Sequence, residues 1–347
     1  MAAPVPKVVT FGEIMLRLSP PGFSRFVQAQ QFDVFYGGGE ANVAASLAQF
    51  GLEAWLVTRL PKHEIGEAAV NSLRRYGVKT GAIVRGGDRL GIYFLEIGAS
   101  QRASKVIYDR AGSSISTLEP GDVDWESVFQ GARWFHWTGI TPALGLGPRQ
   151  ALQQAAKTAQ AMGLTVSADL NYRKKLWSER EAQQVMIPLM EHVNVCIANE
   201  EDAEKSLGMK PRDTNVEQAR IDEAGYAELA SAMKKKFGFS SVAITLRESF
   251  SASRNGWSAM LVDDKECQTP YRSNRYEIEI VDRVGGGDAF AAGLIYSLLT
   301  GTGSKKALEF AVAASCLKQT IPGDFNHTSV SEVNAIVEGG GSGRVQR

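Results

Sequence analysis

Three consecutive glycines followed by an aspartate stand where a strand pattern changes into a helix pattern. Gly285, Gly286 and Gly287 precede Asp288, and all four follow the alternating apolar and charged residues 276–280. Glycine lets backbone N–H groups converge at a helix start, where the helix dipole favours an anion such as phosphate. A carboxylate at the same place can act as a general base, so the segment suggests phosphoryl transfer. An aspartate here is also a common helix N-cap, and capping alone would explain the residue equally well.

A second glycine-rich turn opens another predicted helix, which extends to residue 50. It consists of six consecutive residues: Gly37, Gly38, Gly39, Glu40, Ala41 and Asn42. The backbone of such a turn can approach a polyol closely, and the amide of Asn42 offers both a donor and an acceptor to hydroxyl groups. The alternative is a tight turn from strand to helix that the asparagine caps.

Two arginines stand at the ends of predicted extended segments. Arg173 follows the apolar strand 164–170, at an edge of the sheet where ligands gather in α/β proteins. Arg110 closes the segment 91–110, two residues after Tyr108. The planar guanidinium group matches a carboxylate or a phosphate better than an ammonium group does. Surface salt bridges would explain either arginine alone, whereas the two together fit an acidic sugar.

An acidic segment follows the predicted strand 193–198. It reads Asn199, Glu200, Glu201 and Asp202, and one amide oxygen with several carboxylates suits Mg²⁺ held through retained waters. Phosphoryl transfer needs such a cation to neutralise the phosphates of a nucleotide. An acidic helix start would produce the same segment because of the helix dipole alone.

Other catalytic motifs are absent from the sequence. It contains no GxxxxGK[ST] loop, no GxSxG turn, and no GxGxxG turn with an acidic residue about 20 positions later. The cysteines are far apart and the histidines are isolated, which argues against a disulfide framework, a zinc site and a histidine-centred triad. These residues are Cys196, Cys267, Cys316, His63, His136, His192 and His327.

Composition favours a globular protein with a small substrate. The chain has 347 residues, 44% of them hydrophobic, so it can bury a large core. Its 38 basic and 38 acidic residues cancel, which leaves no overall positive field for nucleic acid. No apolar run approaches the ~20 residues of a membrane helix, and residues 1–7 lack the apolar segment of a signal peptide. We therefore expect a cytoplasmic protein that binds neither nucleic acid nor a membrane.

The elements that must position these residues alternate along the chain. Such alternation predicts a mostly parallel sheet with helices on both faces, where function concentrates at the carboxyl ends of the strands. Apolar runs typical of strands occur at 8–14, 54–60, 134–140, 164–170, 193–198 and 241–246, with helical patterns at 41–50, 66–76, 148–162 and 179–192.

Two segments interrupt this alternation and set the expected domain organisation. Residues 16–36 and 91–110 have extended patterns, and we expect them to form a small β-strand lid that excludes water from the site. Residues 1–336 would then form a single α/β domain, and the glycine-rich residues 337–347 a flexible tail. Asn255-Gly256 predicts a hairpin turn. A second copy would cover apolar edges of the lid, so we expect a homo-oligomer.

The order of these pieces resembles the ribokinase-like (PfkB) family of sugar kinases over essentially the whole chain. The shared features are a GG…N segment near the amino end, an N-x-x-acidic segment in the middle and a D-x-V-G-x-G-D segment late in the chain. Within the family, further segments resemble the kinases that act on 2-keto-3-deoxygluconate (KDG): residues 10–13, 91–94, 108–110, 169–173 and 321–324.

The resemblance implies a fold, a reaction and cofactors. The fold would be the ribokinase-like three-layer α/β fold, with a mostly parallel central sheet, flanking helices and a small β-strand lid. The reaction would be ATP-dependent phosphorylation of the terminal hydroxyl of KDG, giving 2-keto-3-deoxy-6-phosphogluconate. ATP and Mg²⁺ would take part, and a requirement for a monovalent cation stays open.

The resemblance also implies roles for individual residues. Asp288 would take the proton from the substrate hydroxyl, and the amides of Gly285, Gly286 and Gly287 would stabilise the charge on the transferred phosphoryl group. Asn199 and Asp202 would face Mg²⁺ through water. The nucleotide would contact Asn171, Asn199, Thr245 and Arg247. The keto acid would contact Gly37, Gly38, Gly39, Glu40, Ala41, Asn42, Tyr93, Tyr108, Arg110, Arg173 and Asp324.

Two rival functions remain open at this point. A kinase of the same fold could act on another sugar, such as 5-keto-2-deoxygluconate or fructose, although the arginines favour an acid. A non-catalytic sugar-acid sensor could keep the pocket without transferring phosphate. The intact segment from Gly285 to Asp288 argues against the sensor.

Overall fold

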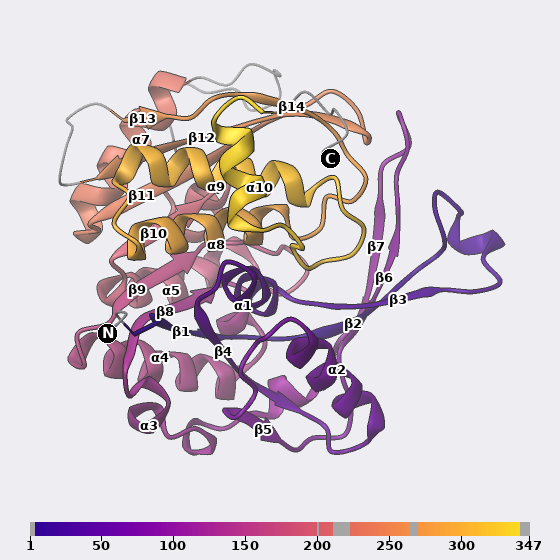
Figure 1. Ribbon diagram of the computed structural model, residues 1–347. Helices are drawn as coiled ribbons and strands as arrows, with labels where there is room; N and C mark the ends of the chain where they lie inside the picture. Colours follow the sequence, from indigo (N-terminus) through magenta and orange to yellow (C-terminus); the bar gives the residue numbers. More distant parts are fainter. Residues whose placement is uncertain (1–3, 200, 211–222, 264–269, 341–347) are drawn as a thin grey trace.

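The central sheet is covered on both faces, as two neighbouring residues of its first strand show. Val8 and Val9 are both fully buried, yet their side chains enter different hydrophobic cores. Successive strand residues point to opposite faces, so two apolar neighbours need a helical layer on each side. The computed structural model, which describes residues 4–199, 201–210, 223–263 and 270–340, contains both layers (Figure 1). The mixed α/β class predicted from the sequence is thus confirmed.

The central sheet has ten strands within these residues. They are β1 (Lys7–Phe11), β4 (Glu53–Leu60), β5 (Ile83–Arg85), β8 (Ala132–Thr138), β9 (Thr165–Asp169), β10 (Val195–Ala198), β11 (Ser241–Ser249), β12 (Arg254–Asp263), β13 (Tyr271–Arg272) and β14 (Tyr276–Glu279). Their order is β13-β12-β11-β10-β9-β8-β1-β4-β5, and β14 also pairs with β12. All neighbours from β11 to β5 are parallel, whereas β12 is antiparallel to each of its partners.

Two layers of helices cover the sheet, and each layer contributes to one of the two cores. The first comprises α1 (Gly39–Gln49), α2 (Glu64–Arg75), α8 (Gly286–Leu299), α9 (Ser304–Lys318) and α10 (Val330–Val337). The second comprises α3 (Trp125–Phe129), α4 (Leu146–Ala161), α5 (Glu179–Leu189), α6 (Asp202–Leu207) and α7 (Glu223–Phe237). Every helix within the described residues is too short or too polar to cross a membrane.

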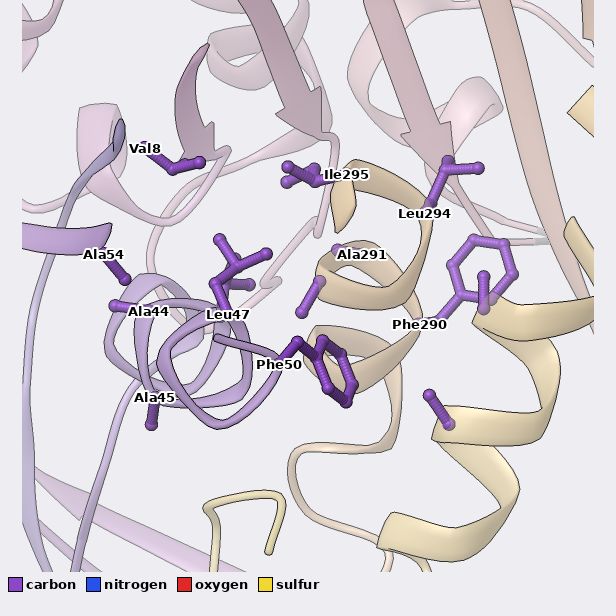
Figure 2. Close-up of a cluster of buried hydrophobic side chains, with 14 of the residues drawn as sticks. Val8, Ala44, Ala45, Leu47, Phe50, Ala54, Phe290, Ala291, Leu294 and Ile295 are labelled. Atoms are coloured by element: carbon purple, nitrogen blue, oxygen red, sulfur yellow. The ribbon is translucent and has the colours of Figure 1, made fainter. Parts of the chain in front are cut away.

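Helices α1 and α8 both begin with a glycine-rich turn, and they pack against each other over the sheet (Figure 2). Ala44 and Ala291 are small enough to let the two helices approach, while Leu47 and Ile295 fill the space towards β1. All four side chains are fully buried. This packing brings the first turns of two helices that are far apart in the sequence to the same edge of the sheet.

A second, four-stranded sheet stands apart from the central one. Its order is β3-β2-β6-β7, formed by β2 (Met15–Ser19), β3 (Asp33–Gly37), β6 (Ile92–Glu96) and β7 (Lys105–Asp109). In Figure 1 these strands project from one side of the molecule. Met15, Tyr93 and Leu95 form a small core that Val284 also contacts, so this sheet packs beside the glycine turn that begins α8.

One prediction for the secondary structure is wrong, and one predicted segment can be followed only in part. Asn255 and Gly256 lie inside β12, paired with Ser249 and Glu248, so the β11–β12 hairpin turns at residues 250–253 instead. Asn255 is buried in this pairing, which favours extended backbone over the turn that the dipeptide adopts in isolation. Of the predicted tail, Val337 ends α10, and residues 341–347 lie outside the described part of the chain.

Candidate active site

A cavity of about 440 Å³ opens at the carboxyl ends of β9, β10 and β11, between the central sheet and the second sheet. Parallel strands place their following residues at this edge, so segments distant in the sequence converge there. Most residues singled out from the sequence line the cavity: Gly38, Gly39, Asn42, Tyr93, Tyr108, Arg110, Asn171, Arg173, Asn199, Asp202, Thr245, Arg247, Gly285, Gly286, Gly287, Asp288 and Asp324.

The turn before α8 has a backbone that only glycine accommodates. Gly285 has a φ of 82°, in the left-handed region, and a Cβ added to it would lie 2.1 Å from the carbonyl oxygen of Asp324. Gly286 begins the helix, and a Cβ on Gly287 would meet no atom within 4 Å. The first amides of α8 therefore stand at an open helix start, where the dipole favours an anion.

Asp288 is not the cap of α8, which decides one alternative left open by the sequence. Gly285 occupies the N-cap position, and no side chain caps this helix. The Oδ2 atom of Asp288 instead accepts a hydrogen bond of 2.6 Å from Nδ2 of Asn42. An ideal Cβ on Gly39 would lie 3.7 Å from the other carboxylate oxygen, so the two glycine turns face each other across Asp288.

Asn42 holds this carboxylate with one end of its amide and its own turn with the other. Its Oδ1 atom accepts a hydrogen bond of 3.2 Å from the amide of Gly38, while Nδ2 donates to Asp288. Asn42 lines the cavity, but both halves of its amide already have partners in the protein. Its clearest action here is to orient the carboxylate.

Burial raises the pKa of Asp288 to about 6, although the hydrogen bond from Asn42 and the charge of Arg173 lower it. An ordinary aspartate has a pKa near 3.8, and such a weak base accepts a proton poorly. A carboxylate with a pKa close to neutrality is better matched to general-base catalysis, because it is both ionised and basic at physiological pH. The geometry and the pKa therefore suit proton abstraction from a hydroxyl group.

Asp169 is a further buried carboxyl group at the cavity, and the sequence did not lead us to assign it to the site. Burial raises the pKa of Asp169 well above its ordinary value, and the charges of Asp202 and Asp288 raise it further. Asp169 is the last residue of β9, so its position at the carboxyl end of a strand was the signal that could have identified it.

In the structure, the side chains expected near Mg²⁺ accept hydrogen bonds from nearby backbone amides. Asp202 accepts hydrogen bonds from the amides of Tyr172 and Asn199, and the Asn199 side chain accepts from the amides of Glu201 and Asp202. In the described part of the chain, which omits Glu200, no cluster of three or more histidine, cysteine or acidic residues could hold a metal by itself. The buried Oδ1 atom of Asn171 lacks a partner beside them. This donor set fits a cation held through water and nucleotide phosphates.

The two arginines have different surroundings. Arg110 forms an ion pair with Glu13, and both side chains are largely buried, so the pair is not the surface salt bridge of the alternative. Arg110 also lines the cavity. Arg173 is exposed and donates a hydrogen bond to the carbonyl of Tyr172. Its charge lowers the pKa of Asp169, Asp202 and Asp288. Arg173 therefore provides positive charge near the acidic residues of the cavity.

A buried ion network attaches the second sheet to this site. Arg17 of β2 has no exposed surface, and its guanidinium group lies 2.6 Å from Asp282 and 2.8 Å from Asp324. The hydroxyl of Tyr93 also donates to Asp324. Burial lowers the pKa of Arg17, but the charges of Asp324 and Asp282 outweigh it and raise the pKa overall.

Sequence reasoning missed Arg17, although a signal existed. The alternation of β2 places Arg17 on the same face as Met15 and Ser19, and that face is the buried one. A charge on a buried face of a strand needs partners of opposite charge.

Three residues expected to contact the substrate do not line the cavity. The carboxylate of Glu40 points inward and accepts hydrogen bonds from the amide and hydroxyl of Thr138 and from the hydroxyl of Thr141. Ala41 is fully buried in the core. Gly37 packs against Asp324, where an added Cβ would lie 2.1 Å from a carboxylate oxygen. These residues shape the turn from behind, so the expected contacts are corrected.

Comparison with known proteins shows which family the chain belongs to. The family model described as pfkB family carbohydrate kinase matches residues 5–327. A solved structure of 2-dehydro-3-deoxygluconokinase from Thermotoga maritima is 56% identical, with a TM-score of 0.92 over 96% of this chain and 99% of that chain. A 2-dehydro-3-deoxygalactonokinase of Haloferax volcanii is 32% identical over 97% of this chain and 98% of its own length. A 2-dehydro-3-deoxygluconokinase of Thermoproteus tenax is 28% identical over 91% of this chain and 89% of its own length. As the resemblance in the sequence predicted, the chain belongs to the pfkB family of carbohydrate kinases.

Proposed function

We propose that the protein transfers the terminal phosphoryl group of ATP to the terminal hydroxyl of KDG, giving ADP and 2-keto-3-deoxy-6-phosphogluconate. The observation that carries this proposal is the carboxylate of Asp288 beside the open start of α8, within a cavity that Arg173 also lines. The likeness to the Thermotoga maritima protein, named 2-dehydro-3-deoxygluconokinase, supports this substrate. A kinase that uses ATP in sugar-acid breakdown would work in the cytoplasm.

Each part of the transfer has a group in the cavity. Asp288 removes the proton from the sugar hydroxyl, and Asn42 keeps the carboxylate aimed. The amides of Gly286 and Gly287 stabilise the charge that develops on the transferred phosphoryl group. Mg²⁺ would neutralise the nucleotide phosphates, held through water near Asn199 and Asp202.

The two substrates would approach from different elements. Residues after β9 and β10 and in β11 would contact the nucleotide: Asn171, Asn199, Thr245 and Arg247. The keto acid would lie under the second sheet, against Gly38, Gly39, Asn42, Tyr93, Tyr108, Arg110, Arg173 and Asp324. The second sheet would then act as a lid, which keeps water from competing with the sugar for the phosphoryl group.

One assay tests the proposed function. ADP release should be measured with ATP, Mg²⁺ and a panel of sugars: KDG, its galacto epimer, 5-keto-2-deoxygluconate and fructose. We expect KDG to give the highest kcat/KM. A higher value for another sugar would reassign the substrate, and no ADP release with any of them would contradict a kinase function.

The pH dependence of the reaction should report the base. Because Asp288 must be ionised to accept a proton and its pKa is about 6, kcat/KM should rise from low pH and level off above that value. The residual activity of Asp288→Asn should not show this rise of kcat/KM from low pH, which we call the acidic limb of the profile. Full activity well below the pKa, in a protein that remains folded, would contradict this assignment.

Replacing Arg173 by alanine should weaken the binding of an acidic sugar more than that of a neutral one. Loss of a charge-assisted hydrogen bond to the carboxylate should raise KM for KDG roughly tenfold or more. KM for an uncharged ketose should change little. Lys174→Ala removes a neighbouring exposed charge that does not line the cavity and serves as the control. Equal effects of Arg173→Ala on both sugars would refute the carboxylate contact.

We also expect the protein to form a homo-oligomer through the second sheet. Its edge strands β3 and β7 expose Val34 (57%) and Ile107 (54%), and the β2–β3 connection exposes Phe23 and Val27. Exposed apolar groups on open sheet edges favour pairing with another copy. Light scattering should give at least twice the monomer mass, and Val34→Lys together with Ile107→Lys should lower it. A wild-type protein that is monomeric would contradict this expectation.

A further inference from the structure

Lys318 is the last residue of α9, and its side chain is fully buried. Its Nζ atom donates hydrogen bonds to two backbone carbonyls, those of Asp282 at 3.4 Å and Ile321 at 3.2 Å. Neither bond goes to a carboxylate. Burying an ammonium group is unfavourable, and a methionine of similar length would fill the same space without that penalty. The charge of Lys318 therefore calls for a role of its own.

The ammonium group lies directly behind the glycine turn. A Cβ on Gly285 would stand 3.1 Å from Cε of Lys318. The same end of α9 holds the turn by other bonds, since the hydroxyl of Ser315 donates to the carbonyl of Gly286 and the carbonyl of Gln319 accepts from the amide of Asp282. The C-terminal turn of α9 is thus the support on which the phosphate-binding turn rests.

Lys318 does not form an ion pair with the carboxylates around it. Asp282 and Asp324 are both paired with Arg17 at short distances, whereas neither forms an ion pair with Lys318. Burial lowers the pKa of Lys318, and the charges of Asp282, Asp324 and Asp288 oppose this. The charge of Lys318 in turn lowers the pKa of Asp288. Positive charge behind the turn thus adds to the dipole of α8.

We propose that Lys318 is a positioning residue that places its ammonium group behind the phosphate-binding turn, so that the turn stabilises the transferred phosphoryl group without a monovalent metal ion. The inference rests on the proposed kinase function. Backbone carbonyl oxygens, such as those that Nζ bonds, are also the ligands by which proteins hold K⁺. The ammonium group of Lys318 occupies the position beside these two carbonyls that such an ion would take.

The test compares Lys318→Met with the wild type, using the best sugar substrate of the wild type. We expect kcat to fall at least about tenfold, because the turn loses charge stabilisation for the transferred phosphoryl group. KM for the sugar should change little, and added K⁺ or NH₄⁺ should restore part of kcat. Lys306→Met makes the same change on the exposed part of α9 and should behave as the wild type. Thermal unfolding and sugar binding by calorimetry should be measured on both variants.

The pH profile provides a readout that a purely structural role would not change. Asp288 faces Arg173 and Asp169 from the end of β9, Asp324 and Lys318 from the α9 side, and the neutral Asn42 from α1. Removing the charge of Lys318 should raise the pKa of Asp288, which moves the acidic limb of kcat/KM to higher pH.

Two results would overturn the inference while leaving the kinase function intact. One is a Lys318→Met enzyme with unchanged kcat and pH profile, or with a loss that no cation restores and that unfolding fully explains. The other is a wild type whose activity falls at least about tenfold when K⁺ is replaced by tetramethylammonium, since the ammonium group then does not replace the ion. The cation replacement uses the wild type alone, so it still tests the inference if Lys318→Met does not fold. A wild type inactive on every sugar would instead reject the function itself.

Discussion

Replacing Asp288 by asparagine should lower kcat by about 100- to 10,000-fold, the range that general-base catalysis contributes. Asparagine keeps the shape of the side chain but cannot accept the proton of the sugar hydroxyl. The amides of the glycine turn remain, so some transfer should persist. KM for ATP should change little, because the phosphates contact the helix start and not the carboxylate.

The same variant should fold at least as well as the wild type. Burial raises the pKa of Asp288 above the value of an unfolded chain, so its ionised form destabilises the folded state increasingly as the pH rises past the unfolded pKa. Asparagine removes that penalty, and its amide can still pair with Asn42. Asp88→Asn, on an exposed loop, is the matched control. Wild-type turnover in Asp288→Asn would exclude the base assignment, and a lower melting temperature would contradict the electrostatic argument.

Replacing Arg17 by methionine should produce the largest loss of stability. The change leaves the buried carboxylates of Asp282 and Asp324 without their cation, and breaking a buried ion pair from one side typically costs about 3–5 kcal/mol. Urea unfolding should therefore give a much lower free energy of unfolding than for the wild type. The loss should grow with pH, because burial raises the pKa of Asp324 and the variant lacks the charge of Arg17 that lowers it, so the ionised form of Asp324 destabilises the folded variant.

The matched control for Arg17→Met is Arg74→Met. Arg74 pairs with Glu67 on the surface, where both side chains are about half exposed, at 56% and 44%. Such pairs contribute roughly 0–1 kcal/mol. Similar losses in the two variants would mean that the network around Arg17 adds no more than a surface salt bridge does.

Local patterns in the sequence were enough to place the central parts of the site. The change from strand to helix periodicity at residues 280–288 located the start of α8, and apolar strands followed by polar residues located Asn171 and Asn199. Both inferences use rules that act over a few residues, together with the geometry of parallel sheets. The glycine turns opening α1 and α8 were found for the same reason.

Interactions between distant residues could not be found in this way. Arg17 bonds to Asp282 and Asp324, which lie 265 and 307 positions away in the sequence. No local sequence pattern predicts such partners. Lys318 looks like an ordinary basic residue at a helix end until α9 packs behind the turn. The predicted substrate contacts of Glu40 and Ala41 were wrong for a related reason. The sequence shows which residues begin a helix, but not which of them face the cavity.

The contacts of the second sheet with residues 282–284 connect this sheet to the glycine turn that begins α8. Arg17 of β2 bonds to Asp282, and Val284 packs against Met15 and Tyr93. Both attachments come within three residues of Gly285, so a displacement of the sheet would act on the turn that we propose binds the phosphates. If a bound sugar were to draw the sheet inward, it would change the affinity for the nucleotide, and by reciprocity the nucleotide would change the affinity for the sugar to the same extent.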